Sequence, residues 1–345
     1  MNFPIISIIV PVYKTPVVLL KRFLKSVFGQ TLPDIQLIAV NDASPDDCPR
    51  ILDAAAANDD RMTVVHRSVN GRAGMARNDG LKLAEGRYVH FADADDFLRP
   101  DMCAKLAGIA DRCGADIVRT SFTTSDLKGK CLSRQRLPDR IWDLTRPRHR
   151  AMAYHDLTFA LWDKLFRREV IVPLHFEQYE ANIGEDTLFN VAALCRSRKI
   201  AMTSYAGYDY TVHPASATGR AVKGMSYLRT LAESGKRIRQ TIEQEDGSRE
   251  GEQFADLIDL KRFATGCGWI AENPDFRKKG ELWKCWRKHF YKDLYPRIYY
   301  RKFLAAWVMG VAALCGPHTA YPLIWGACRI ADPFFLDRRL KDKLN

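Results

Sequence analysis

The chain of 345 residues is long enough to bury a hydrophobic core, and its length suggests about two domains. Hydrophobic residues make up 47% of the sequence and charged residues 27%, which excludes a disordered or low-complexity chain. The net charge of +12 is concentrated near the C-terminus, where residues 277–302 carry ten Lys or Arg against Glu281 and Asp293. Any role of the positive charge is therefore expected to be local to that stretch.

Nine cysteines are scattered along the chain, and they form neither a CxxC pair nor a zinc-ligand spacing. Such an odd, scattered set is typical of reduced thiols in the cytoplasm rather than of a disulfide framework. The N-terminus enters an apolar run directly, without the basic region and cleavage site of a secretion signal. We therefore expect a cytoplasmic location.

The first third of the chain alternates strand patterns with helix patterns. Apolar strand-type runs lie at 5–12, 35–40, 62–66 and 88–92, and periodic helical segments follow the first three, ending near 28, 58 and 84. Alternation of this kind predicts right-handed βαβ units, hence an α/β, Rossmann-like fold with a mostly parallel sheet covered by helices on both faces. From residue 226 to about 269 the pattern changes to two helices around a charged turn at 244–252. A mainly helical C-terminal region is therefore expected.

Three carboxylates follow the fourth strand, at Asp93, Asp95 and Asp96. Acids this close repel one another, and a fold that gathers them usually supplies a cation such as Mg²⁺ or Mn²⁺. Magnesium typically takes one or two carboxylates and completes its shell with water and substrate phosphates, so a nucleotide diphosphate is the matching ligand. The alternative is a solvated acidic turn that caps the helix beginning near Pro100.

Two other strand ends carry candidate ligand-binding residues, because the carboxyl ends of parallel strands meet at one edge of a sheet. Asp42 ends the second strand in a turn of Asp, Ser and Pro, where turn formation alone also explains it. Residues 70–74, Asn-Gly-Arg-Ala-Gly, open a helix and can cradle phosphate through backbone N–H groups, with Arg72 or Arg77 adding charge. The segment lacks the GxGxxG and GK[ST] spacings, which disfavours those two nucleotide-binding classes.

Four segments occur in the order PVYKTPVVLLKRFLKSVFGQT, LIAVNDASPDD, NGRAGMARNDGL and GRYVHFADADDFL. Together they resemble the N-terminal half of a family 2 glycosyltransferase of the GT-A fold. The resemblance implies a nucleotide-sugar donor and a Mn²⁺ or Mg²⁺ cofactor. The positions that it assigns to the donor site are Pro11, Tyr13 and Asp42 at the nucleoside base, Arg77 near the phosphates or the sheet edge, and Asp93 and Asp95 at the ribose and the metal. Where the family commonly has glycine after the base-binding aspartate, this chain has Ala43.

Two later segments extend the resemblance over about the first two-thirds of the chain. Trp162–Phe166 precedes a Glu-Asp pair at 185–186, and in many family 2 enzymes the aspartate of this pair is the catalytic base. By position the base is Asp186, with Glu185 orienting it or contacting the acceptor. Residues 208–216 resemble the closing segment of the family, in which His213 and Ser216 reach the diphosphate or the metal. Acids in a first helical turn are also favoured by the helix dipole alone.

Between these segments, residues 123–140 are polar and contain Gly129 and Pro138. We expect a variable loop region there, with a short hairpin, where acceptor recognition differs from one enzyme to another.

The basic stretch at the C-terminus interleaves aromatic residues with cations and is followed by 303–314, twelve residues without a charge. That run is too short to span a bilayer, which needs about 20 residues. Three interpretations remain. Residues 277–316 can lie on an anionic cytoplasmic leaflet, can form a core helix with a solvated basic face, or can bind nucleic acid. The last is disfavoured because no nucleic-acid-binding motif accompanies the stretch, and a peripheral site on the inner face of the membrane suits a lipid-linked acceptor.

The leading hypothesis is a metal-dependent, inverting glycosyltransferase of bacterial surface polysaccharide biosynthesis. It comprises a GT-A domain at 1–220 and a helical region at 221–345, and it transfers a sugar from a nucleotide-diphosphate sugar, with UDP-sugars favoured, to a hydroxyl of a glycan or lipid-linked glycan. One alternative is a binding or scaffold protein that keeps the fold without turnover. A sugar nucleotidyltransferase is disfavoured, because no glycine-rich loop follows the first strand.

Overall fold

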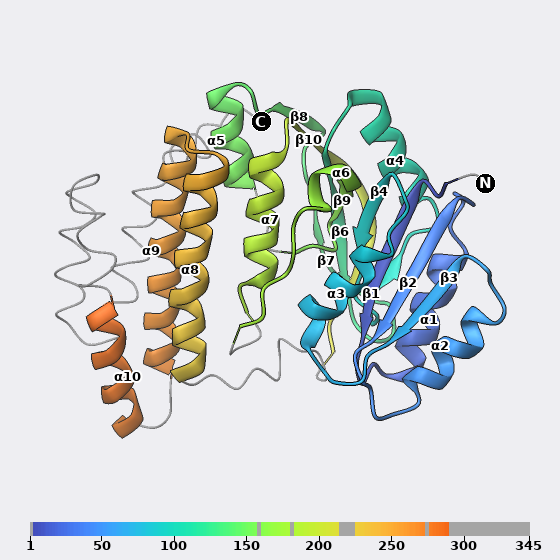
Figure 1. Ribbon diagram of the computed structural model, residues 1–345, viewed down its shortest axis with the longest axis horizontal. Helices are drawn as coiled ribbons and strands as arrows, with labels where there is room; N and C mark the ends of the chain where they lie inside the picture. Colours follow the sequence, from blue (N-terminus) through green and yellow to red (C-terminus); the bar gives the residue numbers. More distant parts are fainter. Residues whose placement is uncertain (1–2, 157–159, 180–182, 214–224, 273–275, 290–345) are drawn as a thin grey trace. The chain divides into compact units, whose positions relative to one another are not determined.

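The computed structural model describes residues 3–156, 160–179, 183–213, 225–272 and 276–289 (Figure 1). The chain divides into two compact units. The sheet unit comprises residues 1–153, 157–178 and 185–221, and the helical unit comprises 154–156, 179–184 and 222–345. Ser216, the apolar run 303–314 and the basic stretch beyond residue 289 lie outside the described residues.

The sheet unit contains one sheet of ten strands in the order β3-β2-β1-β4-β9-β6-β10-β5, with β7 paired to β6 and β8 paired to β10. The strands are β1 (Ile6–Val12), β2 (Ile35–Asn41), β3 (Met62–His66), β4 (Tyr88–Phe91), β5 (Phe97–Leu98), β6 (Ile117–Ser125), β7 (Cys131–Gln135), β8 (Arg140–Asp143), β9 (Lys164–Arg167) and β10 (Lys199–Thr211).

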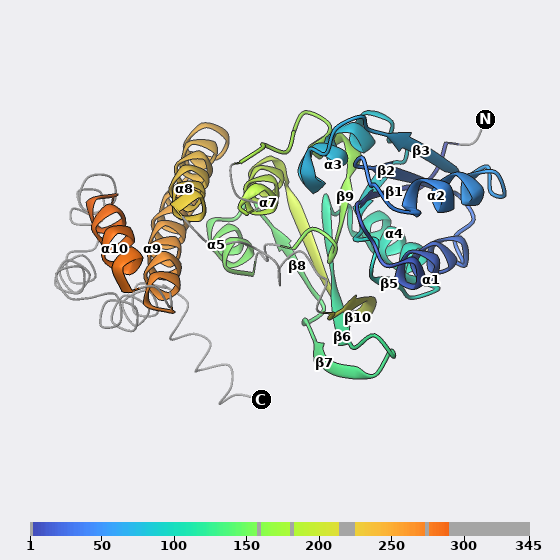
Figure 2. The same cartoon turned by 90° about the horizontal axis from the view of Figure 1, so that it is seen from below.

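The first four strands are parallel and form the region predicted from the sequence. Their side chains alternate between two buried faces, so Ile8 belongs to the core beneath α1 (Val17–Phe28), α2 (Cys48–Ala56) and α4 (Met102–Cys113), whereas Ile9 points to α3 (Arg72–Lys82). Figure 2 shows α3 on one side of these strands and the other three helices on the opposite side. Helix α3 begins at Arg72, within the segment 70–74 that was expected to open a helix.

The second half of the sheet is mixed. Strand β9 runs antiparallel to both β4 and β6, and β10 runs parallel to β6. Strands β6 and β7 form the hairpin expected within residues 123–140. Strand β9 was not predicted from the sequence, because its four residues include Lys164, which is buried and paired with a carboxylate rather than exposed. The described residues add three helices: α5 (Pro147–Asp156), whose last three residues are assigned to the helical unit, α6 (Arg168–Ile171) and α7 (Glu185–Arg196).

The helical unit contains the two helices expected around the charged turn, α8 (Met225–Glu245) and α9 (Arg249–Glu272), followed by α10 (Phe276–His289). Arg239 of α8 is buried and pairs with Asp256 at 2.8 Å and with Asp259 at 2.6 Å, both on α9. The ion pairs therefore hold the two helices in one register. Across the described ranges, no helix combines the length and the apolar character needed to cross a membrane.

Close packing of α3 on the sheet gives a stability prediction. A Cβ added to Gly80 of α3 would lie 2.5 Å from Cγ2 of Ile9, a fully buried and β-branched side chain with little freedom to move. We expect Gly80→Ala to lower the free energy of unfolding by about 1 to 3 kcal/mol, measured by denaturant titration.

Gly108→Ala in α4 is the matched control, because the added Cβ meets only the end of the Arg112 side chain, at 3.2 Å. Alanine is the better helix former by about 1 kcal/mol, so this variant should be neutral or slightly more stable. Equal destabilisation of both variants would contradict the packing argument.

Candidate active site

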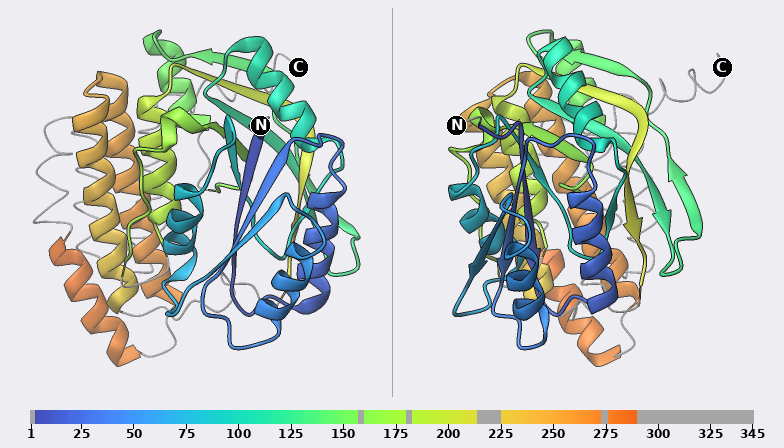
Figure 3. Two further views of the ribbon diagram at one scale, coloured as in Figure 1. Left: turned by 45° about the vertical axis from the view of Figure 1, so that its right-hand side comes forward. Right: turned by 90° about the vertical axis from the view of Figure 1, so that its right-hand side faces the viewer.

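Polar side chains gather at the carboxyl edge of the parallel strands. Tyr13, Asp42 and Arg67 directly follow β1, β2 and β3, and Asp93 follows β4 after one alanine. Because these strands are parallel and neighbours in the sheet, their ends lie at one edge, and Figure 3 shows the blue strands running side by side. This is the edge at which open α/β sheets bind ligands.

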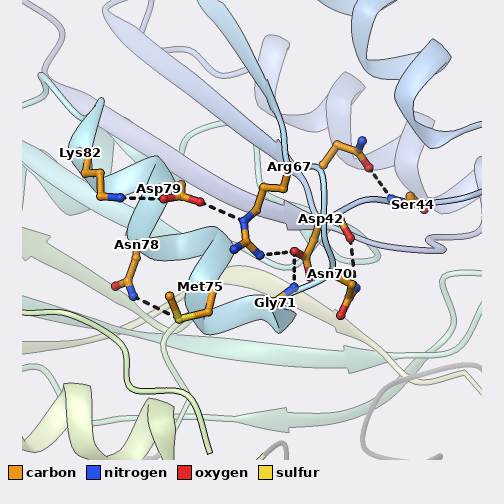
Figure 4. A network of polar contacts seen from close by, with 10 residues as sticks. Asp42, Ser44, Arg67, Asn70, Gly71, Met75, Asn78, Asp79 and Lys82 are labelled. Carbon is orange, nitrogen blue, oxygen red and sulfur yellow. Dashed lines mark hydrogen bonds and ion pairs between the residues drawn. The ribbon is translucent and has the colours of Figure 1, made fainter.

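Asp42 is only 2% exposed, and the chain holds it from several sides (Figure 4). Its Oδ1 accepts hydrogen bonds from Nη1 of Arg67 at 2.5 Å and from the backbone N–H of Gly71 at 2.9 Å. Arg67 is itself fixed by Asp79, whose second oxygen accepts from Lys82. Within the described part of the chain, Oδ2 of Asp42 is buried without a hydrogen-bond partner. One acceptor atom of a fixed carboxylate therefore has no hydrogen-bond partner from the described chain.

The turn beside Asp42 joins the ends of β1 and β2. The backbone N–H of Asp42 donates to the carbonyl of Val12 at 2.9 Å, and the N–H of Lys14 donates to Oγ of Ser44 at 2.7 Å. Ala43 adopts φ 56°, the left-handed conformation that glycine would take with less strain. Tyr13 is 44% exposed at this point, whereas Pro11 is half-buried within β1. Of the predicted base-binding residues, Tyr13 and Asp42 thus directly follow adjacent strands, and Pro11 lies within β1.

Arg77 of α3 connects two parts of the predicted site. Its Nη2 lies 3.0 Å from Oδ1 of Asp93, and its Nη1 lies 2.8 Å from Oδ1 of Asp186 in the first turn of α7. The guanidinium is 6% exposed and lies 5.7 Å from the ring centroid of Phe176. Its Nε is buried without a partner among the described residues. One arginine therefore brings the Glu-Asp pair to the edge that carries Asp93.

The surroundings of these two carboxyl groups change their acidity. Burial raises the pKa of Asp93, the charge of Asp95 raises it further, and Arg77 opposes both. Burial also raises the pKa of Asp186 to about 7, against the pull of Arg77, and the negative charges of Glu185 and Asp93 add to the rise. The side chain of Asp186 is still 34% exposed. It is therefore a reachable carboxylate that can take a proton near neutral pH.

Asp95 is held at the end of β10. Its Oδ2 lies 2.7 Å from Nε2 of His213, and its backbone carbonyl accepts a hydrogen bond from Arg22 at 3.0 Å. The same Arg22 nitrogen donates to the hydroxyl of Thr211, the last residue of β10. Arg22 thus joins α1, the acidic turn and β10.

Asp96 behaves differently from its two neighbours. It is fully buried, and it accepts hydrogen bonds from the hydroxyl of Tyr208 at 2.8 Å and from the backbone N–H of Thr211 at 2.7 Å. Burial raises its pKa well above the usual range of an aspartate, and the charges of Asp93 and Asp95 act in the same direction. Asp96 therefore anchors the turn to β10 and is not available to a ligand.

The Trp162–Phe166 segment supports the acid cluster. Asp163 is fully buried between Arg119 at 2.9 Å and Lys164 at 2.7 Å. The ring of Trp162 stacks on Tyr208 with centroids 4.8 Å apart and on Tyr210 with centroids 5.3 Å apart. Since Tyr208 also accepts a hydrogen bond from the backbone N–H of Asp93, this stack positions the acidic turn.

Among the described residues, no group of three or more His, Cys, Asp or Glu side chains is arranged to hold a metal ion. Asp95 and His213 do offer a carboxylate and an imidazole side by side, and both are ligand types that Mn²⁺ accepts. Magnesium is usually bound by one or two carboxylates together with substrate phosphates. The residues present therefore fit an ion that binds together with a phosphorylated ligand, not one held by the protein alone.

Two residues of the site were absent from the sequence-based prediction. Arg67 directly follows β3, so the strand-end argument that identified Asp42 and Asp93 contained the signal for it. Arg22 lies within α1, and its contact with Asp95 joins residues 73 positions apart. No local pattern marks such a residue.

The parallel sheet edge thus brings together a buried aspartate, an acidic turn and, through one arginine, a second acidic pair. Residues 7–172, just under half of the chain, match the family model described as Glycosyl transferase family 2, so this part of the chain is a glycosyltransferase domain of that family. The predictions of the fold class and of the family are thereby confirmed.

Several relatives are similar over part of the chain. The uncharacterized glycosyltransferase EpsJ of Bacillus subtilis (strain 168) is 32% identical over 222 residues, which are 62% of this chain and 63% of EpsJ, less than two thirds of that protein. The succinoglycan biosynthesis protein ExoO of Rhizobium meliloti (strain 1021) is 26% identical over 254 residues, 69% of this chain and 72% of ExoO. The crystal structure of S. aureus TarS 1-349 in complex with UDP-GlcNAc covers 96% of this chain and 91% of its own, with a TM-score of 0.68 and 18% identity. The last comparison concerns the fold alone.

The double ion pair of Arg77 gives a prediction about stability and pH. Arg77→Met leaves Asp93 and Asp186 without their cation, and each of these side chains is about a third exposed, which screens part of the effect. We expect the free energy of unfolding to fall by about 2 kcal/mol at about pH 8. The loss should shrink toward about pH 5, because both carboxyl groups hold a proton there in the folded variant but not in the unfolded chain. Denaturant titrations at both pH values measure the difference.

Arg50→Met serves as the control, since its ion pair with Asp47 is 3.5 Å long and its side chain is 77% exposed. It should change stability by less than about 0.5 kcal/mol at either pH. A pH-independent loss for Arg77→Met would show that packing on Phe176, and not charge, dominates.

Proposed function

We propose that the protein transfers a sugar from a nucleotide-diphosphate sugar, a UDP-sugar in the first place, to a hydroxyl of a glycan or lipid-linked glycan during bacterial surface polysaccharide biosynthesis. The observation that carries the proposal is the contact of one buried arginine with both Asp93 and Asp186. It brings a general-base candidate to the edge that carries the candidate donor-binding acids. The similarity to a succinoglycan biosynthesis protein and to a fold that binds UDP-GlcNAc in TarS supports this assignment.

The nucleoside base would bind at Asp42. Its buried and unpartnered Oδ2 accepts a hydrogen bond, which matches a base with a ring N–H, such as uracil or guanine. Cytosine and adenine present a ring nitrogen acceptor there, and two acceptors facing each other in a buried site are unfavourable. The exposed ring of Tyr13 lies beside this position and offers a stacking surface.

The diphosphate would bind at the acidic turn together with Mn²⁺ or Mg²⁺. Asp95 is the principal ligand in this proposal, with Asp93 and His213 next to it. When bound, such an ion stabilises the negative charge that develops on the departing diphosphate. The chain's own contribution is to hold Asp95 through Arg22 and Asp93 through Arg77, so that the acidic turn does not have to be ordered when the donor binds.

Asp186 would act as the general base. Its pKa of about 7 suits the removal of a proton from the acceptor hydroxyl, a step that contributes typically ~10² to 10⁴-fold. Glu185 precedes it in the first turn of α7 and raises its pKa, and in this proposal it orients the base or the acceptor. A base on the face opposite the leaving group implies a single displacement with inversion at the anomeric carbon.

Binding of nucleotides to the purified full chain is the first test. We expect uridine diphosphate and its sugars to bind in the presence of Mn²⁺ or Mg²⁺ and to bind at least about tenfold more weakly with chelator or in Asp95→Ala. Asp42→Asn should weaken the binding of the preferred nucleotide selectively, because the asparagine amide can present an N–H group where the carboxylate presents an acceptor.

If no nucleoside diphosphate binds to folded protein, the catalytic proposal fails and the scaffold alternative gains support. Binding that is equally tight with cytidine and uridine diphosphates would contradict the role of Asp42.

The second test concerns the base. Asp186→Asn should lower kcat by at least about 100-fold while nucleotide affinity stays within about twofold of the wild type, since an amide cannot accept the proton. Asp60→Asn, an exposed aspartate on the loop before β3, is the matched control and should retain full activity.

The pH dependence separates proton transfer from positioning. In the wild type, kcat should rise about tenfold per pH unit below 7 and level off above it, because Asp186 must be ionised. A plateau that persists below about pH 5 would assign the proton transfer to another group.

A further inference from the structure

A cavity of about 460 Å³ lies in the sheet unit, and none of its lining residues belongs to the candidate active site described above. Three of its lining residues are arginines from two separate segments, Arg99 after β5 and the pair Arg134 and Arg136 at the end of β7. The remaining lining residues are Thr123, Ser204 and Ala206. The arginine cavity is thus formed by the edge of the β6–β7 hairpin and by neighbouring β10.

Strand register places this cavity behind the candidate active site. Tyr208 pairs with Phe122, and both rings contact Trp162 on the face that carries the acidic turn. The next pair along the strands, Asp209 and Thr123, points to the opposite face because side chains alternate. Arg134 lies directly across from Thr123 on β7. The arginine cavity and the acidic turn are therefore separated by the thickness of one sheet.

The charge in the arginine cavity is only partly balanced. Arg99 pairs with Asp209 at 3.0 Å, and Asp139 nearby already accepts hydrogen bonds from Thr203 and from both the N–H and the hydroxyl of Ser204. In the part of the chain that the structure describes, the guanidinium groups of Arg134 and Arg136 form no hydrogen bond or ion pair, and both side chains are exposed.

Their guanidinium groups repel each other and Arg99, and an anion in the cavity would relieve that repulsion. Solvated arginines on a hairpin need no ligand, but these three line one concave surface together with a buried threonine.

We propose that the arginine cavity is a phosphoryl-binding site, distinct from the donor site, that takes a phosphate or diphosphate group of the acceptor. A single guanidinium fork satisfies a carboxylate, whereas a phosphoryl group has more acceptor oxygens and more charge and uses several arginines. The assignment of the group to the acceptor rests on the proposed function; the phosphoryl site itself does not. The β6–β7 hairpin that carries Arg134 and Arg136 belongs to the polar segment in which acceptor recognition was expected.

Calorimetric titration of the full chain with inorganic pyrophosphate, at low ionic strength and with chelator present, tests the site. We expect one site per chain in the wild type and at least about tenfold weaker binding in the double variant Arg134→Gln, Arg136→Gln, because hydrogen bonds to charged groups are lost. The matched control, Arg112→Gln with Arg148→Gln, removes the same charge from exposed arginines outside the cavity. It should bind pyrophosphate within about twofold of the wild type.

Two possible sources share this chemistry, and a second probe distinguishes them. Tighter binding of pyrophosphate than of glycerophosphoglycerol, a phosphodiester, indicates the diphosphate of a lipid-linked acceptor. The reverse preference indicates a phosphodiester within a glycan chain. The proposal is overturned if neither probe binds, or if the control double variant loses as much affinity as the cavity variant.

Failure of this inference can be told apart from failure of the proposed function. The cavity variant should keep metal-dependent nucleotide binding, and Asp95→Ala should keep pyrophosphate binding under chelator. If nucleotides do not bind at all but pyrophosphate binding still depends on Arg134 and Arg136, the phosphoryl site stands and only its assignment to an acceptor is withdrawn.

Discussion

The guanidinium of Arg77 is the interaction on which the candidate site depends. It is nearly excluded from solvent, and a buried cation requires anionic partners, which Asp93 and Asp186 provide. These partners come from the sheet edge and from α7, so a single side chain contacts acidic groups of two separate elements. Its Nε is a further buried donor, and it has no partner among the described residues. The two carboxylates therefore do not satisfy all the hydrogen-bond donors of this side chain.

The three aspartates of the acidic turn after β4 have different surroundings and therefore different roles. Asp96 is buried and hydrogen-bonded to β10, which makes it a structural anchor. Asp95 reaches His213, and Asp93 faces Arg77. The division follows from the turn conformation of residues 93–96, which directs the three side chains to different partners, and from β10 lying beside the turn.

The mixed half of the sheet supports the parallel half. Strand β9 inserts Lys164 and the preceding Asp163 beneath the acid cluster, and β10 contributes Tyr208, Thr211 and, just past its end, His213. The ring of Trp162, just before β9, stacks on Tyr208 of β10. Loops that carry the candidate ligands are thus backed by paired strands and stacked rings, an arrangement that keeps polar groups in place before a ligand arrives.

The sequence by itself determined the parallel strands, their order along the chain and the residues at their ends. Asp42 and Asp93 were predictable because the period of a strand and the parallel βαβ rule place strand ends together without reference to distant residues. Helices α8 and α9, which flank the charged turn, and the β6–β7 hairpin were predictable for the same local reasons. Asp186 was predicted only from the family resemblance. Its place in the first turn of a helix does not by itself indicate catalysis, because the helix dipole also favours an acidic residue there.

The tertiary structure alone decided which of these side chains meet. The contacts of Arg22 with Asp95, of Arg77 with Asp186 and of Lys164 with buried Asp163 depend on burial and on pairing across the fold. The pKa of about 7 at Asp186 likewise arises from burial among charges contributed by separate elements. Burial and electrostatic coupling are properties of distance in space, and a local sequence pattern contains no record of that distance.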